Sequence, residues 1–212
     1  MTPIKRSGGS AYDDGMHVKI PEIDSLPWYL RWVFRRQQRR YGQPLAPAQV
    51  WARVPALFAA LNGFYAAIER RASPLPPALR SLLQIRVSQI NHCEFCVDLN
   101  AALAAERTGT TDKALAVEHW RESAHFSERE RVALEYAEVM TTTGAVVNPL
   151  LMARLREHFD EVALIELTAL VAFQNLSSKF NAALDIPSQG LCRMPAAAAP
   201  KPTPMPAAAC DR

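Results

Sequence analysis

The stretch from Leu79 to Asp98, LRSLLQIRVSQINHCEFCVD, decides the fold class of this 212-residue chain. Its first part places apolar residues at helical spacing, which predicts an amphipathic helix beginning at Pro77. The pair Asn91-His92 interrupts this pattern. A second helix is expected to begin near Cys93 and to run to residue 107, with a glycine at 109 as its C-terminal stop.

Helical signals continue downstream of this stretch. Residues 56–186 contain only three glycines and four prolines, the residues that most often break a helix. Ser127 forms a capping box with the glutamate three residues later, and Asn148 and Asp160 open further helices. The last helix, residues 161 to about 184, is apolar on nearly all sides and is therefore predicted to be the buried centre of a bundle. The predicted fold class is all-α.

The two ends of the chain differ from this domain, which we place at residues 49–187. Residues 1–20 are predicted to be a flexible N-terminus, and residues 188–212 an Ala/Pro-rich tail with little to bury. Residues 21–48 are predicted to be a helical extension.

The helix of that extension, residues 25–41, places Trp28 and Trp32 among arginines, opposite a face that carries Leu30 and Phe34. One interpretation is a membrane-surface or acidic-partner helix. The favoured one is a helix that docks its apolar face on the bundle and uses the tryptophans at a subunit contact.

Composition excludes several classes of protein. With 49% hydrophobic and 21% charged residues, the chain is typical of a folded globular protein. A net charge of +3 is too small to indicate nucleic-acid binding, and no window of about 18 apolar residues indicates a membrane span. No secretory signal is evident, so we expect a cytoplasmic protein. In that compartment its four cysteines are expected to be redox-active or metal-binding rather than structural.

Cys93-Glu94-Phe95-Cys96 is the one C-x-x-C motif of the chain. At a helix N-terminus, unpaired N–H groups and the helix dipole stabilise a thiolate, and two cysteines one turn apart can form a disulfide. Two alternatives stay open, namely two buried inert cysteines and half of a zinc site. Zinc is disfavoured because structural sites usually pair two such motifs, and no metal site is predicted.

The residues around this motif resemble a known family. The run from Leu79 to Asp98, the later run FSERER at residues 126–131 and the segment IELT at residues 165–168 are similar to the carboxymuconolactone decarboxylase family, in its alkyl hydroperoxidase D-like branch. The similarity extends over about residues 50–187. It implies an all-helical fold, a homo-oligomer (trimer or hexamer) and a cofactor-free thiol peroxidase activity. It also implies a small hydroperoxide or disulfide substrate and a lipoyl-protein or thioredoxin-like reductant.

The family pattern assigns roles to individual residues. It makes Cys96 the peroxidatic cysteine and Cys93 the resolving one. The family also carries a glutamate twelve residues before the first cysteine and a histidine four after the second, which form a proton relay. Here these positions are Ser81 and Asn100, and neither side chain exchanges protons near neutral pH.

Two further residues are candidates for that missing relay. His92 has a suitable pKa for proton exchange but, being adjacent to Cys93, can face away from it. Glu166, in the apolar last helix, could reach the site from across the bundle, although an ion pair with an arginine such as Arg86 is the favoured interpretation. The alternative function is a non-peroxidase family member, either a lyase acting on a lactone or small acid, or a structural helical oligomer.

Overall fold

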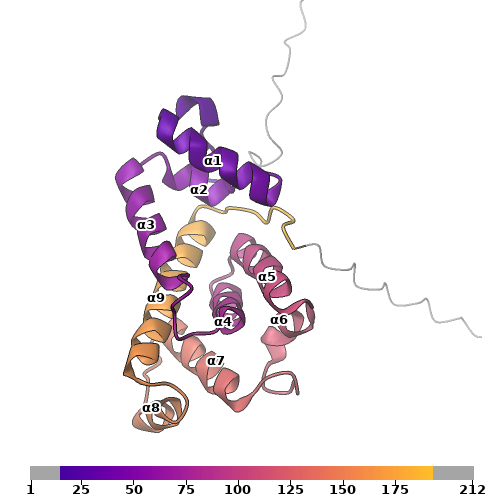
Figure 1. The fold of residues 1–212 in the computed structure, drawn as a ribbon, viewed down its shortest axis with the longest axis vertical. Helices are drawn as coiled ribbons and strands as arrows, with labels where there is room; N and C mark the ends of the chain where they lie inside the picture. The colour runs from indigo at the N-terminus through magenta and orange to yellow at the C-terminus, as the bar shows by residue number, and fades with distance from the viewer. Residues whose placement is uncertain (1–14, 193–212) are drawn as a thin grey trace, which may run out of the picture.

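Helix α4 (Pro77–Ile90) lies at the centre of the molecule in the computed structural model, with α5 (Glu94–Thr108), α7 (Glu128–Thr141) and α9 (Glu161–Ala183) packed around it (Figure 1). The structure describes residues 15–192, which form nine α-helices, two short 3-10 turns and no strand. The all-α prediction is confirmed. The predicted flexible residues 1–14 and the tail residues 193–212 lie outside the described part of the chain.

The prediction that the last helix is the buried centre is wrong. Every residue of α4 from Leu79 to Ser88 is buried except Arg86. On α9, by contrast, Val162 and Ile165 expose 59% and 69% of their surface. Apolar residues all round a helix indicate contacts on several sides, but they do not distinguish burial within one chain from an uncovered outer face.

Local capping signals set the helix boundaries as expected. Ser127 and Glu130 form both hydrogen bonds of a capping box at the start of α7. The side chains of Asn148 and Asp160 each accept a backbone N–H at 2.8 Å, at the starts of α8 (Pro149–Arg156) and α9. Gly109, with φ of 76°, ends α5 in the left-handed conformation that favours glycine, and the short α6 (Asp112–Ala116) follows.

The first three helices cover one end of the bundle. Helices α1 (Trp28–Tyr41), α2 (Ala46–Trp51) and α3 (Pro55–Ile68) lie together at the top of Figure 1, beside the C-terminal end of α9. Leu30 and Phe34 of α1 are buried, and the Phe34 ring lies 6.0 Å from that of Phe58 on α3. Trp28 and Trp32 are exposed. The apolar face of α1 is covered, as predicted, but the residues that cover it belong to α2 and α3 and not to the central bundle.

Both ends of the described part of the chain pack against this region. This packing differs from the prediction of a flexible N-terminus and tail. Met16, Val18 and Ile20 contact the same hydrophobic cluster as the two cysteines. The C-terminal segment, residues 186–192, is fixed by Asp98 of α5, whose carboxylate accepts backbone N–H groups of residues 189, 191 and 192 at 2.6–3.1 Å. Gln189 then joins this segment to the start of α2, because its side chain accepts the Ala46 N–H at 2.9 Å. The sequence predicts flexibility because few residues of these segments are large and apolar. The contacts that the segments make are nevertheless specific.

Candidate functional site

The two cysteines of the C-x-x-C motif form a disulfide where α4 gives way to α5. The Cα atoms of Cys93 and Cys96 lie 5.3 Å apart. Cys93 is the N-cap of α5 and Cys96 lies in its first turn, so the helix itself holds the two side chains together. The break that allows this arrangement is at His92, whose φ of 53° turns the backbone between the two helices.

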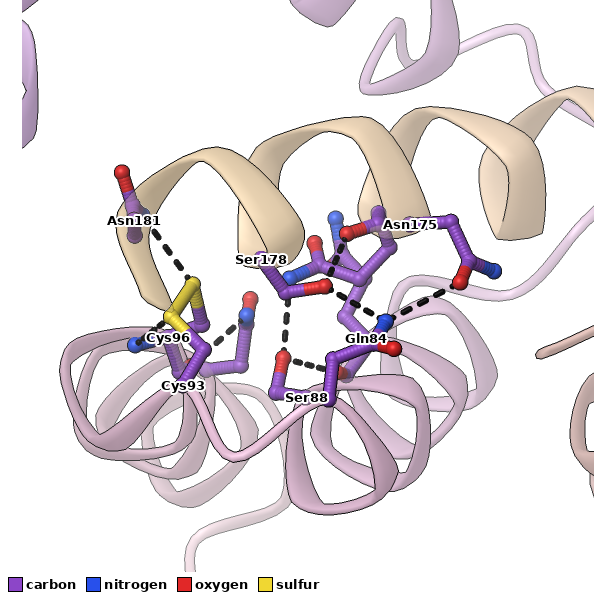
Figure 2. The surroundings of a disulfide bond; sticks show 10 residues. Gln84, Ser88, Cys93, Cys96, Asn175, Ser178 and Asn181 are labelled. Atoms are coloured by element: carbon purple, nitrogen blue, oxygen red, sulfur yellow. Dashed lines mark hydrogen bonds between the residues drawn. A yellow bond between two sulfur atoms is a disulfide. The ribbon is translucent and has the colours of Figure 1, made fainter. Parts of the chain in front are cut away.

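Each sulfur atom accepts one hydrogen bond from an N–H donor. The backbone N–H of Cys96 donates to the Cys93 Sγ at 3.2 Å, which is the helix N-terminal interaction expected from the sequence. The side-chain amide of Asn181, near the end of α9, donates to the Cys96 Sγ at 3.2 Å (Figure 2). Both cysteines are almost fully buried. A thiolate at either position would therefore have one fixed donor and little contact with bulk water.

A polar network between α4 and α9 positions Asn181. Gln174 donates to the Ser88 Oγ at 2.8 Å, and Asn91 donates to the Ser178 Oγ at 2.8 Å. Asn181 lies one helical turn beyond Ser178 on α9. These bonds fix the rotation of α9 relative to α4, so the Asn181 amide is held toward the disulfide by the packing of two helices.

The Cys96 sulfur lies beside a cleft of about 700 Å³. Most of the surface lining this cleft is apolar, and the ring of Trp51, one of the lining residues, stacks on the Phe180 ring at 3.8 Å between centroids. Helices α1, α2 and α3 form one wall, and α5 and α9 form the floor, where Cys96, Asn100 and Asn181 are buried. The cleft can therefore hold an organic molecule of some size directly against the sulfur of Cys96.

Cys93 faces a second depression on the other side of the disulfide. We call it the groove; it has a volume of about 720 Å³ and is lined by His92, Glu94, Asp98 and Cys192 among others. Cys192 is the one cysteine among the described residues outside the disulfide. Burial, with a smaller contribution from Asp98, raises the pKa of the Cys192 thiol and so opposes its ionisation.

The predicted pocket residues occupy three different places. Asn100 lines the cleft and donates to the Cys96 backbone carbonyl at 2.9 Å. His92 is exposed and lines the groove on the Cys93 side. Ser81 is fully buried, and its hydroxyl accepts a hydrogen bond from Arg107 at 2.7 Å. Of the three, only Asn100 is next to Cys96.

Glu166 does not reach the site. It lies fifteen residues before Asn181 on α9, which corresponds to about 22 Å along the helix. Its carboxylate pairs with Arg70 and accepts the Ser73 hydroxyl at 2.7 Å. The idea that it approaches the cysteines is therefore wrong, and the arginine that it pairs with is Arg70. Arg86 pairs instead with Glu138 at 2.6 Å.

Two residues of the cleft were missed by the sequence analysis. One is Asn181, and the other is Glu69, which directly follows α3 and lines the cleft. The Glu69 carboxylate accepts from Arg107 at 2.6 Å and lies 3.4 Å from Arg80, so two guanidinium groups partner its charge. An asparagine in an apolar helix is a weak signal, and nothing in the sequence points Glu69 toward Cys96.

No grouping of three His, Cys, Asp or Glu side chains suited to a metal ion occurs within residues 15–192. Likewise, no helix in this part of the chain is long and apolar enough to cross a membrane. The arrangement that remains is a helical bundle with a C-x-x-C disulfide, one sulfur facing an apolar cleft and the other a polar groove. It defines a class of all-helical proteins with a C-x-x-C cysteine pair at the junction of two helices.

Comparison with known proteins identifies the family. Residues 55–139 match the model of the carboxymuconolactone decarboxylase family. The uncharacterized protein YnjA of Escherichia coli (strain K12) is 49% identical over 179 residues, which cover 83% of this chain and 97% of that protein. The chain belongs to the carboxymuconolactone decarboxylase family, as its resemblance indicated.

Solved structures share the fold. An uncharacterized peroxidase-related protein from Silicibacter sp. TM1040 superimposes with a TM-score of 0.75 at 21% identity, covering 84% of this chain and 94% of the other. The debrominase Bmp8, as a cysteine-to-alanine variant in complex with 2,3,4-tribromopyrrole, gives a TM-score of 0.69 at 22% identity, covering 77% of this chain and 87% of that one. These likenesses establish an alkyl hydroperoxidase D-like helical fold.

Proposed function

We propose that this protein is a cofactor-independent thiol peroxidase or thiol-disulfide oxidoreductase, in which Cys96 is the attacking cysteine and Cys93 the resolving one. The observation that carries the proposal is the Cys93–Cys96 disulfide with the Cys96 sulfur at the floor of the apolar cleft. An organic hydroperoxide in the cleft meets Cys96 first, whereas Cys93 lines the groove.

The reaction starts from the reduced pair. The Cys96 thiolate attacks the terminal oxygen of the hydroperoxide, the O–O bond breaks, and the alkoxide leaves and takes a proton from water. Cys96 is now a sulfenic acid. The Cys93 thiol attacks that sulfur, the disulfide forms, and the hydroxyl group leaves with the Cys93 proton as water. In total two thiols and one hydroperoxide give a disulfide, an alcohol and water.

The Cys96 thiolate is stabilised in this scheme by a hydrogen bond rather than by a proton relay. Asn181 is the side-chain donor that contacts Cys96 Sγ, at 3.2 Å. A hydrogen bond to the charged form of an acid lowers its pKa, and an amide does so without titrating itself. Asn181 thus takes over part of the role that the histidine plays in the family pattern.

The disulfide is reduced from the groove, which is where a lipoyl-protein or thioredoxin-like dithiol can approach Cys93. A thiolate of the reductant attacks the Cys93 sulfur, Cys96 leaves as a thiolate, and a mixed disulfide with Cys93 forms. The second thiol of the reductant then attacks the reductant's own sulfur in that mixed disulfide, so that Cys93 leaves and the reductant ends as a disulfide. The hydrogen bond from Asn181 favours the departure of Cys96, because it stabilises the leaving group.

Steady-state consumption of cumene hydroperoxide, with dihydrolipoamide as reductant, tests this function. Wild-type protein is expected to turn over, Cys96→Ser to lose activity completely, and Cys192→Ser to keep it. Cys192→Ser is the matched control because its thiol lies outside the disulfide. Equal activity of wild-type and Cys96→Ser proteins would contradict the proposal.

A second candidate reaction uses the same pair of thiols. The aromatic side chains that line the cleft, Trp51, Phe58, Phe95 and Phe173 among them, suit a flat halogenated ring. Two thiols could replace a carbon–bromine bond by a carbon–hydrogen bond, giving a disulfide and hydrogen bromide. Bromide release from a bromopyrrole by the reduced protein, absent in Cys96→Ser, would favour this reaction over peroxide reduction.

We also propose that the protein is a homo-oligomer. The support comes from α9, where the apolar side chains of Val162, Ile165 and Leu176 are exposed in the single chain. A second copy would cover such a face. Light scattering coupled to gel filtration is expected to give a multiple of the chain mass, and Ile165→Glu to lower it.

A further inference from the structure

Arg36 is the unpaired cation at the rim of the cleft. It lies on the exposed part of α1 and lines the cleft, and no acidic partner for it occurs within residues 15–192. The other charges of the lining are partnered. Arg40 pairs with Glu106, and the Glu69 carboxylate lies against Arg107 and Arg80. The cleft therefore has one spare positive charge, and that charge is at its mouth.

The interior of the cleft differs from its rim. Trp51, Phe58, Leu61, Phe95 and Leu99 line the cleft together with Cys96. A ligand that fits both parts has an apolar body next to these side chains and a negatively charged group next to Arg36. Burial of the apolar body supplies affinity, and the charged group fixes which end of the ligand points outward.

We infer that the cleft binds amphipathic carboxylates, that is, molecules with an apolar chain or ring and one carboxylate head held by Arg36. This inference rests on the proposed function, because it names the class of substrate that the same cleft would present to Cys96. A carboxylate matches the single spare charge, whereas a phosphate monoester carries between one and a half and two negative charges at neutral pH. With the head at the rim, the apolar end of the substrate extends toward the Cys96 sulfur.

The neighbouring arginine supplies a matched control. Arg35 is on the same helix, is exposed, and is not among the residues that line the cleft. Replacing Arg35 or Arg36 by glutamine changes the net charge of the protein by the same amount. A difference between the two variants therefore reports on the position of the charge relative to the cleft and not on the overall charge of α1.

The test is calorimetric titration of the oxidised protein with octanoate and, separately, with octanol. Octanoate is expected to bind at least about tenfold more tightly than octanol, equivalent to about 1.4 kcal/mol. Arg36→Gln is expected to abolish that difference while octanol affinity stays the same, Arg36→Lys to keep most of it, and Arg35→Gln to change nothing.

Three outcomes would overturn the inference: equal affinities for octanoate and octanol, no binding of either, or the same loss in Arg35→Gln as in Arg36→Gln. The disulfide is closed throughout, so binding is measured without any turnover. A protein that binds octanoate through Arg36 but consumes no hydroperoxide would refute the proposed peroxidase and leave this site standing.

Discussion

Replacing Asn181 by leucine tests how the Cys96 thiolate is stabilised. Leucine has nearly the shape of asparagine but donates no hydrogen bond, so the change removes the 3.2 Å contact with the Cys96 sulfur and little else. A hydrogen bond to a charged group contributes about 1.5–3 kcal/mol, and sulfur acceptors belong at the lower end of that range. With about 1.36 kcal/mol for each pKa unit, the Cys96 pKa should rise by about one unit.

The opposite electrostatic change is Asn181→Asp. It places a carboxylate where the amide was, and a negative charge next to a thiol disfavours the thiolate. We therefore expect the Cys96 pKa to rise further in Asn181→Asp than in Asn181→Leu. This order separates an electrostatic role of Asn181 from a merely structural one, because loss of packing alone would not raise the Cys96 pKa more in Asn181→Asp than in Asn181→Leu.

The assay is the pH dependence of iodoacetamide alkylation at Cys96, measured by mass spectrometry in a background where Cys93 and Cys192 are serine. Thr168→Val serves as the control, because Thr168 lies on the same helix but its hydroxyl is 2.8 Å from that of Tyr136 and contacts no sulfur. An unchanged alkylation midpoint in Asn181→Leu, or the same rise in Thr168→Val, would refute the reasoning.

Three further changes have defined outcomes. Asn100→His puts an imidazole in the cleft beside Cys96, and the pH profile of peroxide consumption should gain a second ionisation near pH 6–7. Burial alone would raise the pKa of Glu138, but hydrogen bonds from two arginines and a tryptophan outweigh it and lower that pKa. The Glu138 carboxylate therefore stabilises the folded state above the unfolded-state pKa of about 4.3, and this stabilisation is lost as the pH falls through the lower folded-state pKa. In urea unfolding, Glu138→Gln should lower the free energy of unfolding by about 2 kcal/mol at pH 7 and by progressively less below pH 4. Asp98→Ala removes the acceptor of three backbone N–H groups, so limited proteolysis should cut residues 186–192 faster than in the wild type.

Local signals were the part of the fold that the sequence could predict. The caps at Ser127, Asn148 and Asp160 each depend on a hydrogen bond to a residue three positions away, so a few consecutive residues determine their geometry. The same holds for Cys93 and Cys96, because one helical turn sets the distance between them.

The sequence could not predict the contacts between helices that are far apart along the chain. Asn181 lies 85 positions from Cys96, and the two meet only because a polar network fixes how α9 rests on α4. The error in predicting which helix lies at the centre of the bundle has a related cause. The side chains of α4 include the buried Arg80, Ser81 and Gln84, so its burial could not be recognised from apolar content.

A serine stands at position 81, where the family pattern has its relay glutamate. The carboxylate in this part of the cleft comes from another residue. The Ser81 hydroxyl binds Arg107, and Arg107 binds Glu69, so α3 supplies an acid near where a glutamate on α4 would extend. Both guanidinium groups contact the same carboxylate oxygen of Glu69, Oε2. The hydrogen bond that contacts the Cys96 sulfur comes from the side-chain amide of Asn181, a group that does not titrate. Activation of the thiol should therefore follow a single ionisation, that of Cys96 itself.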